Sequence, residues 1–458
     1  MLLSNIVSID VGGQLFQTTK HTLTQAGSQS LFSQLLLANP ASSLPFFIDR
    51  DPELFSVLLS LLRTGNLPSR AKAFDVQDLI FESRFYGIEQ LLINSTSNPS
   101  LLDPFNLQKS MVLPFSGRDS PASIATTPSG SLHVAHGSKV TSFDWALQRK
   151  STILTPFTAI DSLLALSPNV VAAGATDLSG LQILDVDQGS VTDTLQWENV
   201  TRSDSTVLAI GSSHQYMFTS FESGRRNSSC VMVYDLNTFR PVTEIGHCEI
   251  FGADLDSAIP ATKLRWIPTH NLLMAAGSHS GPSGVSGNVK FWDLRSRNTA
   301  PVWEVKERAD CFSDITVTPG GMLFKVGVHS GEVFFADFRN ILSSSSDDSV
   351  WVCLGGADGW RTGNNNNKKK KKEGVGCRIE SHGNQVFRSK GGQIELWSEV
   401  LVGSGNGGGV FRKNTMGETW SDSNSITHMS FGGNKMFVTR KDQQYVEVWQ
   451  NCVSSRLL

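Results

Sequence analysis

The sequence is poor in the features that mark secreted, membrane-spanning or nucleic-acid-binding proteins. Its six cysteines among 458 residues are scattered and form no Cys-x-x-Cys pair, so we expect a reduced intracellular protein with free thiols. No apolar run reaches the roughly 18 residues that a membrane-spanning helix needs, and we expect no secretion signal at the N-terminus. The 39 basic and 42 acidic residues leave a net charge of −3, which gives no general attraction for nucleic acid.

The length and composition indicate more than one folded domain. A single core rarely organises 458 residues, so two or more domains are expected. Hydrophobic residues make up 39% of the chain and charged residues 18%, which is typical of globular proteins.

The first hundred residues alternate between short strands and helices. Residues 6–18 predict a β-hairpin, because apolar residues alternate on both sides of Gly12-Gly13. Asp51 followed by Pro52 predicts a helix start, and Gly65 predicts its end. A further helix is predicted over residues 76–93, with Phe85 on its buried face.

Three blocks in this region carry a resemblance to a known family. IVSIDVGGQLFQTTKHTL, FFIDRDPELFSVLLSLLRTGNL and FESRFYGIEQLL resemble the BTB domain of the potassium-channel tetramerisation-domain family. The resemblance implies a T1-type BTB/POZ domain over residues 5–95 that self-associates. No Cys/His cluster of the kind that binds intersubunit zinc is seen, so no metal is expected. The signature positions are Gly12, Gly13, Phe16, Thr18, Thr19, Asp49, Arg50, Asp51, Phe55, Arg63, Gly65, Phe85, Tyr86 and Gly87.

Each signature residue taken alone also fits a structural role. A glycine pair makes a turn, phenylalanines fill a core, and aspartates cap helices. The implication of self-association therefore rests on the whole pattern.

From about residue 119 onward the chain repeats. Seven segments share a short strand, a turn, an apolar strand, a second turn and an alternating strand that ends near an aromatic or aliphatic residue. The same turn of four repeats contains a proline, namely Pro128, Pro168, Pro268 and Pro319. Proline has no N–H, and at a turn none is needed for the hydrogen bonds between strands. The closing strands recur about every 40 to 60 residues, the length of one four-stranded propeller blade.

The ends of the closing strands resemble WD repeats in a degenerate form. The chain is thus interpreted as multidomain: an N-terminal α/β BTB/POZ (T1-type) domain, then an all-β seven-bladed WD-repeat-like propeller over residues 111–458. A different all-β repeat, or a ring of six or eight blades, stays open as an alternative. The signature positions are Asp185, Tyr234, Asp235, Trp292, Asp293, Trp397 and Trp449.

The last repeat has too little chain for a fourth strand. Because an open edge invites aggregation, residues 111–115 are predicted to supply the outer strand of the seventh blade, after a linker over residues 96–110. The asparagine- and lysine-rich stretch at 361–374 predicts a solvated loop. Its run Lys368–Lys372 fits either plain solvation or a nuclear localisation signal.

Catalytic and cofactor motifs are weak. Gly403–Gly408 has the spacing of a phosphate-binding loop, and Gly277–Gly281 is spaced like a nucleophile elbow, but no helix is predicted after either. His133 and His136 have no nearby third ligand for zinc. We therefore expect no enzyme activity and no catalytic residue, metal or cofactor.

The combined resemblance implies an adaptor. Many BTB proteins with a recognition domain are substrate adaptors of cullin-3 RING E3 ubiquitin ligases, with the BTB domain on the cullin and the second domain on the target. The alternative is an oligomeric scaffold or ion-channel regulatory protein without ligase function. The expected partners are a second copy of the chain, cullin-3 and an unknown protein target on the propeller, where Trp351 and Trp360 are candidate contacts. The expected location is the cytoplasm, with the nucleus as a possible additional location.

Overall fold

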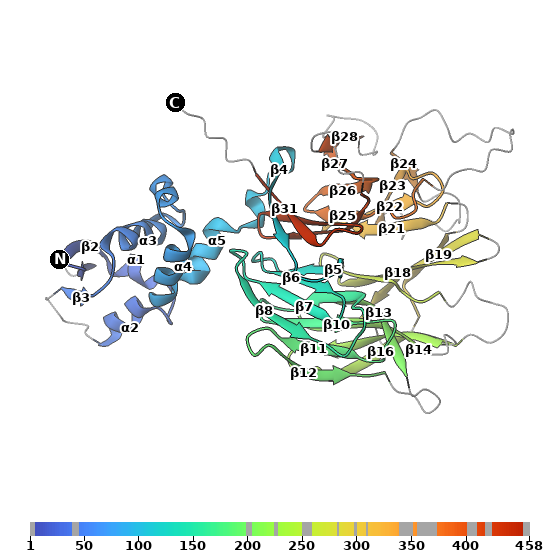
Figure 1. The fold of residues 1–458 in the computed structure, drawn as a ribbon, viewed down its shortest axis with the longest axis horizontal. Helices are drawn as coiled ribbons and strands as arrows, with labels where there is room; N and C mark the ends of the chain where they lie inside the picture. Colours follow the sequence, from blue (N-terminus) through green and yellow to red (C-terminus); the bar gives the residue numbers. More distant parts are fainter. Residues whose placement is uncertain are drawn as a thin grey trace. The chain divides into compact units, whose positions relative to one another are not determined.

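The chain divides into two units whose main boundary lies between Leu102 and Asp103. The computed structural model describes residues 5–38, 45–197, 204–223, 228–249, 259–281, 284–296, 300–307, 310–338, 351–354, 373–400, 410–416 and 424–451. The two units are called the first unit and the ring unit below. Figure 1 shows the helices of the first unit in blue and the sheets of the ring unit in cyan to red.

In its described residues, the first unit combines a three-stranded sheet with five α-helices. The sheet has the order β2-β1-β3, with β1 antiparallel to β2 and parallel to β3. One face of β1 is buried and the other is open, as the alternation of its side chains predicts. The elements are β1 (Ile6–Val11), β2 (Gln14–Thr19), α1 (Lys20–Thr24), α2 (Leu31–Ala38), β3 (Phe46–Ile48), α3 (Pro52–Thr64), α4 (Val76–Phe85) and α5 (Glu89–Thr96), with a 3₁₀ turn at Ser69–Ala73.

The predicted ends of α3 are confirmed. The Asp51 carboxylate accepts hydrogen bonds from the backbone N–H groups of Glu53 (2.7 Å) and Leu54 (3.1 Å), which otherwise have no partner at a helix start. At the other end Gly65 adopts φ +73°, the left-handed conformation that closes a helix.

The single helix predicted over residues 76–93 is wrong. The chain turns at Tyr86 and Gly87, where Gly87 has φ +68°, and this turn separates α4 from α5. The apolar periodicity continues through the turn because both helices pack on the same core, and this continuity hides the break.

The ring unit is built from four-stranded antiparallel sheets. Seven such sheets lie in the described residues, in the order in which the repeats predict them. The first three sheets comprise β5 (Pro121–Thr126), β6 (Leu132–His136), β7 (Lys139–Phe143) and β8 (Arg149–Leu154); β9 (Ser162–Ala165), β10 (Val170–Gly174), β11 (Leu181–Asp185) and β12 (Ser190–Leu195); and β13 (Ser205–Ser212), β14 (Tyr216–Ser223), β15 (Ser228–Asp235) and β16 (Pro241–Glu249).

The remaining sheets follow the same plan, except that the last one takes its outer strand from before the first. They comprise β17 (Lys263–Ile267), β18 (Leu272–Gly281), β19 (Gly284–Asp293) and β20 (Trp303–Glu307); β21 (Phe312–Val317), β22 (Met322–Gly327), β23 (Val333–Asp337) and β24 (Val352–Cys353); β25 (Ile379–His382), β26 (Gln385–Lys390), β27 (Gln393–Val400) and β28 (Val410–Met416); and β29 (Ile426–Gly432), β30 (Lys435–Arg440), β31 (Tyr445–Asn451) and β4 (Leu107–Pro114).

The first strands of successive sheets contact one another, and β29 contacts β5, so the described sheets close into a ring. Hydrophobic cores fill the space between neighbouring sheets, as where Phe218 and Trp292 lie in one cluster between the third and fourth sheets. The first strands therefore line the middle of the ring, and the fourth strands form its outer wall.

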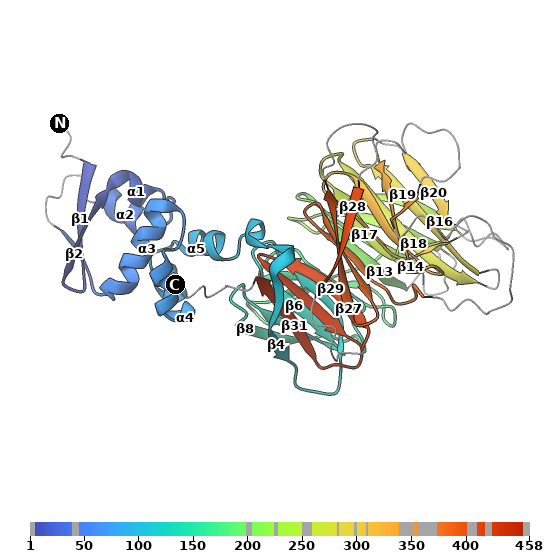
Figure 2. The same ribbon diagram turned by 90° about the horizontal axis from the view of Figure 1, so that it is seen from above.

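β4 joins the two ends of the ring. It pairs antiparallel with β31, with Leu113 opposite Val446 and Leu107 opposite Asn451. Figures 1 and 2 both show β4, in cyan, beside the red β31. The strand runs over Leu107–Pro114, so it begins four residues earlier than the predicted segment 111–115 and occupies the end of the predicted linker.

Candidate functional site

Most signature residues of the first unit hold its fold. The Gly12-Gly13 turn joins β1 to β2, and Gly12 N–H donates to the carbonyl of Ile48 (3.0 Å). Phe16 meets Phe55 edge to face at 4.9 Å between ring centroids, and Tyr86 is fully buried. Four other positions are also structural: Thr19 caps α1, Arg63 donates to the carbonyl of Gln17 (2.7 Å), Thr18 is buried, and Gly87 packs closely on Ser30. Asp49 is exposed beside β3.

Phe85 is not a core residue, contrary to the prediction. Its side chain is 41% exposed, and the Arg50 guanidinium lies 4.0 Å from its ring centroid. Arg50 also pairs with the buried Glu82 at 3.4 Å. Phe81 is 62% exposed and lies one helical turn before Phe85, so the two rings share one face of α4.

The outer face of the small sheet exposes large apolar side chains among polar ones. Asp10 in β1 stands opposite both Leu15 in β2 and Phe47 in β3, so these three side chains form one row across the sheet. Leu15 is 56% exposed and Phe47 is 65% exposed. Among the described residues, Oδ1 of Asp10 is buried without a hydrogen-bond partner. Large exposed apolar side chains grouped in this way mark a surface for association.

The signature residues of the ring unit are structural as well. The carboxylates of Asp185 and Asp235 accept backbone N–H bonds two and three residues further on, at 2.8–3.0 Å, and Asp293 accepts from Arg295 in the same way. These hydrogen bonds fix the turns that follow the third strands. Tyr234, Trp292, Trp397 and Trp449 are buried between sheets.

The structure places the remaining candidate residues outside any functional site or outside the described residues. Trp351 donates through Nε1 to Glu307 of β20, and its ring lies 4.7 Å from Nζ of Lys325 in β22, so it packs against the core between the fourth and fifth sheets. Trp360, Gly403–Gly408 and Lys368–Lys372 lie outside the described residues. Gly277–Gly281 belongs to β18. His133 is fully buried with Nδ1 2.8 Å from Ser142 Oγ, and His136 Nε2 lies 2.8 Å from Thr141 Oγ1.

Within the described ranges, no group of three or more His, Cys, Asp or Glu side chains is placed to hold a metal ion. No helix in the described part of the chain is long and apolar enough to cross a membrane.

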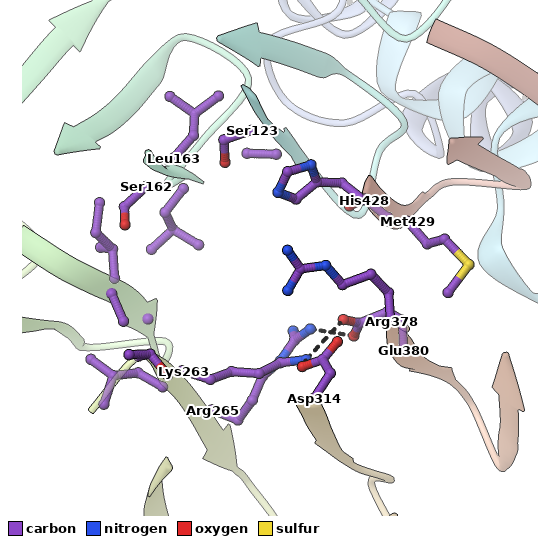
Figure 3. Close-up of a pocket in the computed structure, with 18 of the residues that line it drawn as sticks. Ser123, Ser162, Leu163, Lys263, Arg265, Asp314, Arg378, Glu380, His428 and Met429 are labelled. Atoms are coloured by element: carbon purple, nitrogen blue, oxygen red, sulfur yellow. Dashed lines mark hydrogen bonds and ion pairs between the residues drawn. The ribbon is translucent and has the colours of Figure 1, made fainter. Parts of the chain in front are cut away.

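The middle of the ring contains a polar cavity of about 660 Å³. Its walls are formed by the first strands of all seven sheets, and Figure 3 shows part of the lining. Since the first strands are sheet edges, they also present backbone polar groups to this space. The cavity is within the size range that accommodates a drug-sized ligand.

Ion pairs are concentrated on one side of the cavity. Lys263 Nζ lies 2.8 Å from Asp314 Oδ1 and 3.7 Å from Glu380 Oε2, and Arg265 pairs with Glu380. Asp314 Oδ2 also accepts from the N–H of Ile379 at 2.9 Å. Burial acts to raise the pKa of Asp314, but the charges of Lys263 and Arg378 outweigh it and hold the pKa below its usual value.

Arg378 differs from its charged neighbours. Its Nε donates to the carbonyl of Thr427 at 2.8 Å, which fixes the side chain. Figure 3 shows its guanidinium extending into the cavity, with His428 on one side and the Asp314–Glu380 group on the other. Among the described residues, no hydrogen bond or ion pair is formed by its two terminal nitrogens. Burial, and then the charge of Arg378, lowers the pKa of His428 to about 4, so the imidazole is neutral at neutral pH.

This cluster was not predicted from the sequence. Lys263, Asp314 and Arg378 are separated by more than 50 residues each, and the packing of the fourth, fifth and sixth sheets side by side brings them together. A charged residue in the first strand of a repeat would have been the signal, because every first strand faces the middle of a propeller.

Comparisons with known proteins agree with the two-unit structure. Residues 7–96 match the family model described as BTB/POZ domain, and residues 116–451 match the one described as At2g24240-like, C-terminal beta propeller. The expected fold class, a BTB/POZ domain followed by an all-β propeller, is thereby confirmed. The propeller match begins just after β4, so the strand that joins the ends of the ring lies outside it.

Three relatives show how far the similarity extends. The BTB/POZ domain-containing protein At5g41330 of Arabidopsis thaliana is 59% identical over 460 residues, which cover 98% of this chain and 96% of that protein. The BTB/POZ domain-containing protein At4g30940 of the same plant is 30% identical over 319 residues, covering 66% of this chain and 68% of that protein. Human BTB/POZ domain-containing protein KCTD14 is 34% identical over 93 residues, covering 20% of this chain and 35% of that protein.

The propeller match spans most of the sequence and the At5g41330 similarity spans nearly all of it. The chain therefore belongs to the family of BTB/POZ domain-containing proteins with a C-terminal β-propeller of the At2g24240-like type.

Proposed function

We propose that this protein is a non-catalytic substrate-recognition adaptor of a cullin-3 RING E3 ubiquitin ligase. Its BTB domain self-associates and binds the cullin, and its propeller binds the target protein. The observation that carries the proposal is the pairing of a BTB domain that exposes apolar side chains with a propeller that encloses a polar cavity. The location proposed is the cytoplasm.

We assign self-association and cullin binding to two different apolar areas of the BTB domain. The row formed by Leu15, Asp10 and Phe47 is assigned to self-association, because exposed apolar side chains on a sheet face can pack against the same face of a second copy. The Phe81–Phe85 face of α4 is assigned to the cullin, because aromatic side chains on one helix face can enter a groove of a partner. Self-association then places several propellers on one frame, so weak contacts to a target gain strength through avidity.

The test measures the two activities separately on the full chain. Light scattering coupled to size exclusion gives the oligomeric state, and titration with the purified cullin-3 N-terminal domain gives the affinity. Phe47→Arg is expected to lower the oligomeric state, and Phe81→Asp is expected to weaken cullin binding at least tenfold without changing the oligomer. Leu154→Arg, which changes an exposed leucine on β8 of the propeller, is the matched control and is expected to change neither.

Absence of cullin binding at micromolar concentration, in a chain whose BTB domain is folded, would contradict the ligase role. An intact oligomer in that experiment would favour the alternative of a scaffold or ion-channel regulatory protein. A monomer would contradict both.

A further inference from the structure

Among the described residues that line the propeller cavity, Arg378 is a cation whose charge acts on Asp314 but whose terminal nitrogens form no hydrogen bond or ion pair. Lys263 and Arg265 are paired with Asp314 and Glu380, as described above. Asp161, another acid in the lining, is held by Thr176, whose N–H and hydroxyl donate to it at 3.0 and 2.6 Å. Arg378 is left with two terminal nitrogens that point into the cavity and, among the described residues, have no acceptor.

The guanidinium of Arg378 favours an anionic ligand. A guanidinium presents parallel N–H donors in a plane, which match the two oxygens of a carboxylate or phosphate. The neutral His428 beside it adds no second positive charge and leaves the imidazole able to share a hydrogen bond. The hydroxyl groups of Ser123 and Ser162 also line the cavity, as Figure 3 shows, and that of Ser162 donates to the carbonyl of Leu208 at 3.0 Å.

The size of the cavity favours a peptide over a small ion as its ligand. About 660 Å³ is far more than one carboxylate or phosphate fills, so an anion alone would leave most of the space to water. A short segment of protein can place one anionic side chain on Arg378 and pair its backbone with the polar edges of the first strands.

We propose that the propeller binds its protein target through a segment that inserts one anionic side chain, a carboxylate or a phosphorylated hydroxyl, against the terminal nitrogens of Arg378. This inference rests on the proposed function in one respect, that the ligand is part of the target. It adds the chemical class of the target: an acidic or phosphorylated segment.

The experiment uses the full chain and a random seven-residue peptide library displayed on phage. Selection on the wild-type protein is expected to enrich Asp or Glu at one position, and selection on Arg378→Gln is expected to lose that enrichment. The best peptide is then synthesised with Glu, Gln or phosphoserine at that position, and its affinity is measured by calorimetry. We expect the Glu or the phosphoserine peptide to bind the wild type at least tenfold more tightly than the Gln peptide, and the stronger of the two identifies the anion.

Two further variants serve as a control and as a conservative substitution. Arg412→Gln removes an exposed arginine from β28 of the same sheet and is expected to leave the discrimination unchanged. Arg378→Lys keeps the charge but loses the paired N–H donors of the guanidinium. It must therefore weaken the binding of the Glu peptide by more than the binding of the Gln peptide. If Arg378→Gln fails to fold, as judged by tryptophan fluorescence, the lysine variant carries the test.

Three results would overturn the proposal: no acidic enrichment, an enrichment that survives Arg378→Gln, or inorganic phosphate or acetate that binds as tightly as the peptides. None of these depends on cullin-3. A failure here would therefore leave the ligase role standing, and a failure of cullin binding would leave the peptide result unaffected.

Discussion

Glycines 12 and 13 form the turn of the first hairpin, yet their surroundings differ. Gly12 has φ +57°, and a Cβ added there would lie 2.5 Å from the carbonyl oxygen of Arg50 and 3.2 Å from Pro52 Cδ. Gly13 has φ +89° and nothing within 4 Å of a Cβ. The first position is closed by backbone that cannot move aside, whereas the second is limited only by its dihedral angle.

We predict that Gly12→Ala destabilises the BTB domain more than Gly13→Ala does. Both changes strain a positive φ by about 1 kcal/mol, but only the first adds a clash, and the total is expected to reach about 3 kcal/mol. Hydrogen exchange of the Val7, Ile9 and Val11 amides in the full chain measures the difference. Equal protection in the two variants would contradict the importance of the contact with Arg50.

Glu447 is the most connected buried acid of the last blade. Its carboxylate is fully buried and receives Arg440 Nε at 3.0 Å, Trp449 Nε1 at 3.1 Å and Lys109 Nζ at 3.3 Å. The pair of Arg440 and Glu447 repeats in the sixth blade as Arg388 and Glu395 at 2.8 Å. A buried pair of this kind contributes little net stability when intact but leaves an uncompensated charge when one member is removed.

Glu447→Gln is therefore predicted to lower the free energy of unfolding of the propeller by about 3 kcal/mol. Asp187→Asn, which breaks the exposed ion pair of Lys150 and Asp187 at 2.7 Å, is the control and is expected to cost less than about 1 kcal/mol. Urea unfolding followed by tryptophan fluorescence gives both values. Similar losses in the two variants would show that burial of Glu447 does not matter.

At the scale of elements, β4 decides whether the ring is closed. It covers the edge of β31 that would otherwise expose a row of backbone groups, and it buries Leu107 and Leu113. Its Lys109 also reaches Glu447 from the outer strand. The loss of β4 therefore exposes the edge of β31 and removes part of a core and an ion pair at once.

A chain over residues 103–458 is predicted to be folded, whereas a chain over residues 115–458 is predicted to lose stability and aggregate. The physical reason is the unpaired edge of β31. Thermal unfolding and size exclusion measure the difference, and a synthetic peptide of residues 103–115 added to the shorter chain is expected to restore part of it. Equal melting temperatures of the two chains would contradict a closing role for β4.

The sequence allowed some of these elements to be predicted and left others hidden. A count of the chain after Trp449 was enough to place the outer strand of the last blade before the first one, because a four-stranded sheet needs a partner for β31. The break between α4 and α5 was missed because Phe85 and Ile88 keep the apolar spacing. The cavity could not be predicted, because Arg378 and His428 meet only through the ring.

At the scale of the whole molecule, the two domains have separate spectroscopic signals. All ten tryptophans lie at position 145 or later, so tryptophan fluorescence of the full chain reports the propeller alone. Three histidines of the propeller, His133, His136 and His428, have pKa values lowered chiefly by burial. The native propeller therefore favours the neutral form of these three histidines.

The stability of the propeller is predicted to fall as the pH is lowered from about 6.5 to about 4. In this window an unfolded histidine takes up a proton, whereas His133, with a pKa of about 4, stays neutral in the native state. The unfolded state then binds more protons, so acid favours it, by up to about 3 kcal/mol for the fully buried His133. Urea titrations at pH 7 and pH 4.5, followed by tryptophan fluorescence, measure the change. His133→Asn should make the profile shallower, because His136 and His428 still contribute, while His214→Asn, which changes an exposed histidine, leaves it unchanged. A wild-type propeller equally stable at both pH values would contradict the burial of neutral histidines.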